Sequence, residues 1–184
     1  VGSEMCIRDR DVETDTQLLN RLLNRIRQPP HGGAAPDYEL WALEVPGVTR
    51  AWVYPLQMGL GTVTVLFVCD GETNIIPGSA KVAEVQAYIN ERAPVTAEVF
   101  VAAPVPDPLN LAVKISPNTV AVQASVRAEV EDLIVRDSKP GSPILISRLR
   151  EAVSIAAGEA DNQITSPIAD VPHSAGHMAV PGTI

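Results

Sequence analysis

The sequence predicts an α+β fold, arranged as two small α+β domains in tandem, each with a short, mostly antiparallel sheet and packed helices. Segments with helical periodicity alternate with segments of strand periodicity along most of the 184 residues. The stretch Pro104-Val-Pro-Asp-Pro108 has three prolines in five residues and divides these segments into two sets. Hydrophobic residues make up 46% of the chain and aromatic residues 4%, so we expect cores of mainly Val, Leu, Ile and Ala.

Residues 1–10 are excluded from the fold because they show neither helical nor strand periodicity. They resemble the translation of a sequencing-adaptor read-through, and an ordinary disordered terminus is the alternative. In the first case, the natural upstream sequence is missing and the chain is a fragment. In both cases we expect deletion of residues 1–10 to leave the melting temperature unchanged, whereas a loss of several degrees would show that they contribute to folding.

The first domain is expected over residues 11–103 and begins with a helix. Thr14 and Gln17 have the spacing of a capping box. One apolar stripe follows them, formed by Leu18, Leu19, Leu22, Leu23 and Ile26. The other expected elements are a short helix from Pro36 to Val45, a strand over 48–54, a strand over 62–68, a helix capped by Ser79 and a strand over 95–101.

Residues 104–108 are expected to form a stiff, extended linker and the preferred site of limited proteolysis. The second domain, residues 109–184, begins with a strand of alternating apolar residues that Pro117 ends. Thr119 can cap a long helix whose buried stripe runs from Val122 to Ile134. The remaining expected elements are a helix capped by Ser147 and two short strands, near Ile164 and over 178–180.

The charge and the cysteine content narrow the class of protein. The net charge of −8 argues against a nucleic-acid groove, which needs a basic stripe, and against binding to an anionic membrane surface. No apolar run approaches the ~20 residues of a membrane-spanning helix. The two cysteines, Cys6 and Cys69, do not form a disulfide framework. Cys69 ends an apolar run and is expected to be buried, in a protein of a reducing compartment.

No group of residues predicts a catalytic, metal or cofactor site. His173 and His177 are four apart, but they lie in a Pro- and Gly-containing stretch that will not form a helix, so we expect a solvated loop. Asp70-Gly-Glu72 lacks the alternating ligands of a calcium loop and is expected to be a hairpin turn. The acidic run of the long helix is expected to be a solvated face: Glu129, Glu131, Asp132 and Asp137. We expect no enzyme; the alternative is a small soluble enzyme or ligand-binding protein whose site is not visible in sequence.

Several short segments match one family pattern in order and in spacing. They are Glu13-Thr-Asp15, Pro30-His-Gly-Gly33, Tyr38-x-x-Trp41-Ala-Leu-Glu-Val-Pro-Gly-Val-Thr-Arg-Ala-Trp52, Gly61-x-Val-x-Val-x-Phe67, Pro94-Val-Thr-Ala-Glu-Val99, Ser147-Arg-Leu149 and Thr165-Ser-Pro-x-x-Asp-Val171. From about residue 11 to the C-terminus, the chain therefore resembles the C-terminal part of the baseplate J-like family, structural proteins of contractile phage tails.

The resemblance implies a structural subunit of the baseplate wedge in a Mu-like phage tail, or in a related prophage or tailocin particle, that acts by protein–protein assembly. It implies no enzyme activity, no catalytic residues and no cofactor. The implied partners are other baseplate wedge and tail proteins and other copies of the chain, with no nucleic acid, no membrane and no small-molecule substrate. The implied location is the virion, after assembly in the cytoplasm of the bacterial host.

Two regions are candidate interfaces for such an assembly. Arg21 and Arg25 lie off the apolar stripe of the first helix. Leu56, Met58 and Leu60 make the loop over 55–61 too apolar for a free loop tip. The two tryptophans flank a strand entry in a chain with few aromatic residues, and they are expected to be structural: Trp41 and Trp52. If Trp52 is buried, Trp52→Ala should cost about 3–5 kcal/mol.

Overall fold

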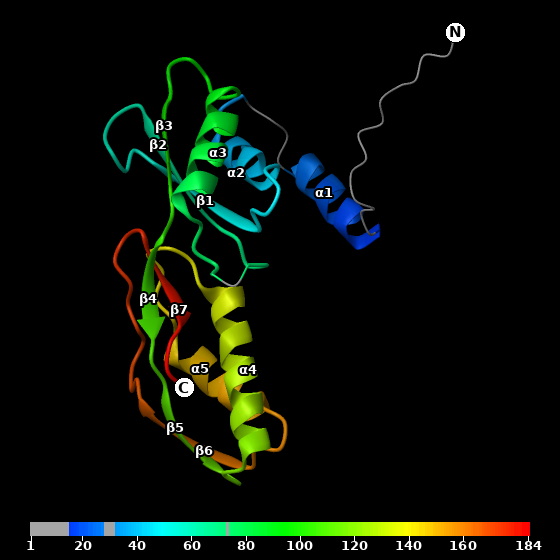
Figure 1. Ribbon diagram of the computed structural model, residues 1–184, viewed down its shortest axis with the longest axis vertical. Coiled ribbons are helices and arrows are strands. Elements are labelled where there is room, and N and C mark those ends of the chain that lie inside the picture. Colours follow the sequence, from blue (N-terminus) through cyan, green and yellow to red (C-terminus); the bar gives the residue numbers. More distant parts are fainter. Residues whose placement is uncertain (1–14, 28–31, 73) are drawn as a thin grey trace.

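The structure, a computed structural model, describes residues 15–27, 32–72 and 74–184. It contains two α+β units in tandem, the first around a three-stranded sheet and the second around two short two-stranded sheets (Figure 1). The predicted α+β class and tandem arrangement are confirmed. Helix α1 (Asp15–Arg27) precedes the first unit, but Thr14 and the side chain of Gln17, the predicted capping box, lie outside the described residues.

The first domain packs two helices against a mixed sheet of order β1-β2-β3. Strands β1 and β2 are antiparallel and β2 and β3 are parallel, so the sheet is less antiparallel than predicted. Helix α3 lies between β2 and β3 in sequence and returns the chain to the same end of the sheet, as parallel pairing requires. The elements are α2 (Ala35–Leu43), β1 (Arg50–Pro55), β2 (Thr62–Val68), α3 (Ser79–Asn90) and β3 (Glu98–Ala102).

The core of the first domain lies between one face of this sheet and helices α2 and α3. Strand β2 contributes Val65 and Phe67, which are fully buried. Cys69 is also fully buried, as predicted, and its burial, followed by the charge of Glu72, raises the pKa of the thiol. The fully or almost fully buried helix residues that pack here are Tyr38, Ala42, Val85 and Ile89.

The second domain builds its core on the long helix α4 (Val120–Asp137). The predicted cap is confirmed, because the hydroxyl of Thr119 accepts a hydrogen bond from the Val122 backbone N–H at 3.3 Å. The predicted buried stripe is also confirmed: Val122, Val126, Val130, Leu133 and Ile134. The other elements are β4 (Val105–Leu109), β5 (Ala112–Ser116), α5 (Ile146–Ile155), β6 (Asp161–Ser166) and β7 (His177–Pro181).

Two other predicted helix caps are wrong. Helix α3 starts one residue earlier than expected, with Gly78 at the cap, so Ser79 is the first helical residue. Helix α5 has Leu145 at the cap, and Ser147 lies inside the helix. In place of a local serine cap, Asp170 accepts a hydrogen bond from the Ile146 backbone N–H at 2.9 Å. A distant carboxylate therefore satisfies a free donor of the first turn, which local sequence cannot indicate.

The proline-rich stretch over 104–108 is extended, as predicted, but most of it is a paired strand and not a free linker. Strand β4 runs parallel to β7, with Val105 opposite His177 and Leu109 opposite Pro181. The prolines at 106 and 108 are compatible with this pairing because alternate residues of a strand direct their backbone groups away from the partner. The position of the domain boundary stays a prediction.

This pairing changes the expected pattern of limited proteolysis. Because β4 is hydrogen-bonded along its length, an unspecific protease should cut the exposed loop over 56–61 before it cuts 104–108. Mass spectrometry of the first fragments tests this. A first cut between residues 104 and 108 would instead show that this stretch behaves as a free linker.

The predicted solvated loop around His173 is also wrong. The His173 side chain is only 1% exposed, and its Nδ1 lies 2.7 Å from Oδ2 of Asp107 in β4. The Nε2 atom is buried without a hydrogen-bond partner in the described part of the chain. His173 therefore attaches the loop before β7 to the neighbouring strand. His177 lies at the start of β7.

Candidate assembly surface and the contact between the domains

The loop that connects β1 and β2 displays three large apolar side chains to solvent. Leu56 is 58% exposed, Met58 65% and Leu60 95%. A contiguous exposed apolar group of this kind is more typical of an interaction site than of a free surface. The structure therefore brings the three predicted interface residues of this loop together on one exposed tip.

The conformation of this loop is fixed by the residue that ends it. Thr62 is 6% exposed, and its hydroxyl donates to the carbonyl of Gly59 at 2.8 Å and accepts from the N–H of Met58 at 3.2 Å. The Thr62 carbonyl accepts from the N–H of Leu56 at 2.9 Å. Leu56 has φ of 61°, a left-handed conformation that costs a leucine about 1–2 kcal/mol. The protein thus stabilises a strained loop that exposes apolar side chains, a feature that folding alone does not require.

Val95 is a further exposed apolar residue near this loop, and the sequence did not predict its exposure. It was expected to lie in a strand with Ala97, Val99 and Val101, but it precedes β3 and is fully exposed. The Glu98 N–H donates to the carbonyl of Gly61 at 3.1 Å, which places the start of β3 beside the end of the apolar loop. The Ala97 N–H donates to the carbonyl of Pro94 at 3.0 Å, and this tight turn keeps Val95 out of the strand.

The other predicted interface residues belong to α1. The side chains of Arg21 and Arg25 lie outside the described part of the structure, so their role stays a prediction. The apolar stripe of the same helix is largely exposed: Leu18, Leu19, Leu22 and Ile26 are 49–67% accessible.

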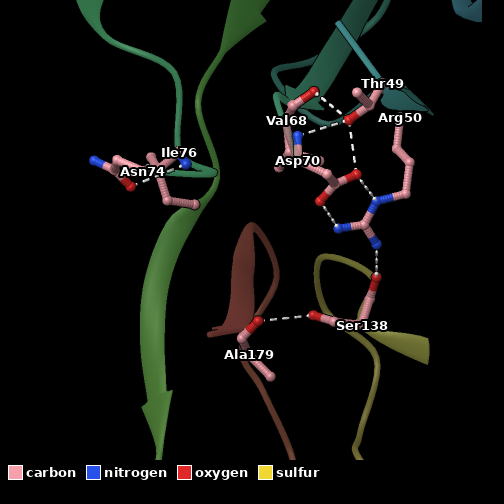
Figure 2. Close-up of polar contacts among 8 residues, drawn as sticks. All are labelled: Thr49, Arg50, Val68, Asp70, Asn74, Ile76, Ser138 and Ala179. Atoms are coloured by element: carbon pink, nitrogen blue, oxygen red, sulfur yellow. Dashed lines mark hydrogen bonds and ion pairs between the residues drawn. The ribbon is translucent and has the colours of Figure 1, made fainter. Parts of the chain in front are cut away.

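Arg50 joins the two domains through one guanidinium group. Its Nε and Nη2 atoms donate to the two carboxylate oxygens of Asp70, each at 2.7 Å, and its Nη1 donates to the carbonyl of Ser138 at 3.1 Å (Figure 2). Ser138 ends α4 in the second domain, where the partial negative charge of the helix C-terminus favours a cation. The Ser138 hydroxyl donates to the carbonyl of Ala179 in β7 at 2.9 Å, which fixes this segment within its own domain.

The Asp70 carboxylate is held by more than one donor. The hydroxyl of Thr49 donates to its Oδ2 at 2.7 Å, and the same hydroxyl accepts from the Asp70 N–H at 2.9 Å. Burial alone would raise the pKa of Asp70, but the hydrogen bonds from Arg50 and Thr49 and the charge of Arg50 outweigh it and lower the pKa. Asp70 therefore stays ionised in the folded protein over the whole neutral range.

This shift predicts a specific dependence of stability on pH. A carboxylate whose pKa is lower in the folded protein stabilises it fully above the unfolded-state pKa, about 3.9, and loses this effect as pH falls through the folded-state pKa. The difference in free energy of unfolding between the wild type and Asp70→Asn should therefore be constant from pH 7 to about pH 5 and shrink below pH 4. Urea unfolding at pH 7, 5 and 3 tests this, and a constant difference down to pH 3 would contradict it.

The outer face of β1 forms the rest of the contact. Residues 50, 52 and 54 alternate with Ala51 and Val53, which face the core side. The hydroxyl of Tyr54 donates to the carbonyl of Pro140 in the second domain at 2.7 Å. Trp52 is half-buried on this face, under the Arg50 guanidinium at 5.3 Å, and is not part of either core. Because the side chain is not fully buried, the expected cost of Trp52→Ala is smaller than the full 3–5 kcal/mol of a core tryptophan.

Comparisons with known proteins place this chain in a family. The model of the baseplate J-like central domain matches residues 30–103, and the model of the baseplate J-like protein C-terminal domain matches residues 109–184. The chain belongs to the baseplate J-like family. Within this baseplate J-like chain, the exposed loop and the Arg50 side chain both belong to the central domain, and Ser138 belongs to the C-terminal domain.

Relatives include phage and prophage proteins. The Mu-like prophage FluMu protein gp47 of Haemophilus influenzae is 38% identical over 95% of this chain and 52% of its own length. The baseplate protein gp47 of Escherichia phage Mu is 36% identical over 85% of this chain and 46% of its own length. The phage-like element PBSX protein XkdT of Bacillus subtilis is 28% identical over 72% of this chain and 39% of its own length. The chain thus spans about half the length of the first two of these relatives and less than half the length of the third.

Proposed function

We propose that this chain is a structural subunit of the baseplate of a contractile phage tail, or of a related prophage or tailocin particle, and that it acts by assembly without turnover. The observation that carries the proposal is the strained loop that exposes Leu56, Met58 and Leu60 in a chain of the baseplate J-like family. Its partners would be other baseplate wedge and tail proteins and other copies of itself. It would be assembled in the cytoplasm of the bacterial host and carried in the virion.

The geometry of the contact between the domains supports this function. An assembly subunit has to hold its interfaces at fixed positions relative to one another, so its domains should move as one rigid body. Two hydrogen bonds cross the contact, one from the Arg50 guanidinium to the Ser138 carbonyl and one from the Tyr54 hydroxyl to the Pro140 carbonyl. Two further bonds hold the guanidinium on the Asp70 carboxylate within the first domain. The described helices also include none that is both long and apolar enough to cross a bilayer.

The alternative, a small enzyme or ligand-binding protein, would need titratable groups gathered around an enclosed apolar pocket. Among the described residues, no three His, Cys, Asp or Glu side chains are grouped so that they could hold a metal ion. A groove between β5 and α4 is lined mainly by aliphatic side chains together with Lys114 and Arg127, and in this part of the chain its lining includes no His, Cys, Asp or Glu. These features favour assembly over catalysis.

A double substitution in the apolar loop tests the proposal. Leu56→Asp with Met58→Asp should weaken the complex with the neighbouring baseplate proteins by at least about tenfold, because it places two charges in an apolar interface. Aspartate tolerates the left-handed conformation of residue 56 better than leucine does, so the isolated domain should stay folded. The measurement is affinity purification of the tagged chain co-expressed with the neighbouring tail genes, followed by quantification of each partner.

The matched control is Ile168→Asp, which changes an 81% exposed aliphatic residue of the second domain in the same way. It should leave the complex intact. The proposal fails if the wild-type chain stays monomeric beside every tail neighbour, or if it binds a metabolite tightly in an enclosed pocket.

A further inference from the structure

Strand β5 has a free edge in the described part of the structure. Its partner is β6, and no other strand pairs with it there. The N–H of Leu111, just before β5, donates to the carbonyl of Thr183 at 2.9 Å, whereas the carbonyl of Ala112 accepts from the Thr165 hydroxyl in β6 at 2.9 Å. These neighbouring residues therefore direct their backbone groups to opposite edges of the strand.

The alternation continues along β5 and defines which groups are free. Backbone groups of successive residues in a strand point to alternate edges, so Val113 and Ile115 point to the same edge as Leu111. The register shift between β5 and β6 leaves this unchanged, since its extra residue, Thr165, lies in β6. The backbone N–H and C=O groups of Val113 and Ile115 thus lie on the same edge as the Leu111 N–H, which pairs with Thr183 after β7. Unpaired edges of this kind accept an additional strand.

A groove lies along this edge, between β5 and the first half of α4, with Ile184 at one end. Its floor is aliphatic, formed by Val113, Ile115, Val120 and Ala124, and Val120 is 82% exposed. Lys114 and Arg127 line it as well. Lys114 has no ion pair with any described residue, and Arg127 donates to the carbonyl of Ile184 at 2.8 Å. Two cations thus lie beside an apolar groove on a chain with a net charge of −8.

We propose that this groove binds an extended, acidic segment of a partner protein, which adds to β5 as a further strand. Its backbone would pair with Val113 and Ile115. Its aliphatic side chains, on the same face as those two residues, would cover Val120 and Ala124. Its carboxylates, on the opposite face of the added strand, would lie beside Lys114. Strand addition of this kind takes affinity from main-chain hydrogen bonds and specificity from pockets for alternate side chains. The site lies at the end of the molecule away from the first domain, so it is separate from the apolar loop (Figure 1).

Synthetic peptides test this site on the whole 184-residue chain. One acetylated nonapeptide alternates valine and glutamate, and the comparison peptide alternates valine and lysine. In amide NMR spectra, the glutamate peptide should cause saturable shifts of residues 112–116 and of the first half of α4. The lysine peptide should bind at least about tenfold more weakly because its charge is repelled by Lys114.

The substitution Lys114→Glu should reduce the affinity for the glutamate peptide by about tenfold, whereas Arg150→Glu, the same charge change at an exposed site of α5, should not. Dispersed amide spectra show that both variants are folded. The inference is overturned if neither peptide shifts these residues, if both bind equally, or if the two variants behave alike. It is also overturned if the same amides shift with protein concentration alone, which would assign the groove to a second copy of the chain.

Discussion

Phe67→Ala should lower the free energy of unfolding by about 3–5 kcal/mol, the typical cost of removing a fully buried phenylalanine. The Phe67 side chain is fully buried in β2, the central strand of the first sheet, where it lies opposite Ala51 of β1 and belongs to the core shared with helices α2 and α3. The substitution would leave a cavity in the core. Because this chain has only two phenylalanines, few aromatic side chains are available to fill that cavity. Urea unfolding, followed by far-UV circular dichroism, measures the change.

The chain supplies a matched control in its second phenylalanine. Phe100 lies in β3 opposite Thr64, which puts it on the face of the sheet away from this core, and it is only partly buried. Phe100→Ala should therefore cost clearly less than Phe67→Ala. Equal costs for the two substitutions would mean that the core has been assigned to the wrong face of the sheet.

Arg50→Ala should both destabilise the protein and uncouple its domains. The substitution leaves the Asp70 carboxylate and the Ser138 carbonyl without their shared donor, and an unsatisfied buried group costs about 1–3 kcal/mol. Arg50→Lys should not restore stability, because an ammonium group cannot bind both Asp70 oxygens and the Ser138 carbonyl in this planar arrangement.

The distribution of tryptophans makes the uncoupling measurable. Both tryptophans, Trp41 and Trp52, lie in the first domain, so tryptophan fluorescence reports on that domain and, through Trp52, on the contact between the domains, but not on the core of the second domain. Circular dichroism reports on both domains. In the wild type, the two unfolding curves should coincide, as a single cooperative transition requires. In Arg50→Ala they should separate, and coincident curves in the variant would show that Arg50 does not couple the domains.

The parts of the fold that local periodicity controls were predicted from sequence. The apolar stripe of α4, from Val122 to Ile134, and its Thr119 cap are set by residues three or four apart, and the structure confirms both. The β-branched strand over 62–68 is confirmed for the same reason. The loop residues Leu56, Met58 and Leu60 were predicted to form an interface because they make the loop too apolar for a free tip. The structure exposes all three, and their interface role stays a prediction.

The features that depend on distant residues were not predicted. The pairing of β4 with β7 joins residues more than seventy positions apart, so a proline-rich sequence gives no sign of it. The burial of His173 depends on Asp107 in the same way. The contact of Arg50 with Ser138 depends on how the two domains meet, and an alternating strand pattern does not state which face of β1 lies at a domain boundary. Local sequence fixes elements, whereas these contacts are set by tertiary arrangement.

Immunogold electron microscopy of particles from the phage or prophage that encodes this chain tests the central claim, that the protein is a baseplate subunit, most directly. A gene for the chain with an epitope tag at its C-terminus would replace the natural copy, and purified particles would be labelled with an antibody against the tag. We expect gold particles at the baseplate end of the tail and the tagged protein in the mass spectrum of the purified tails. Tails that are complete but unlabelled, with the tagged protein confined to the soluble fraction of the lysate, would contradict the account.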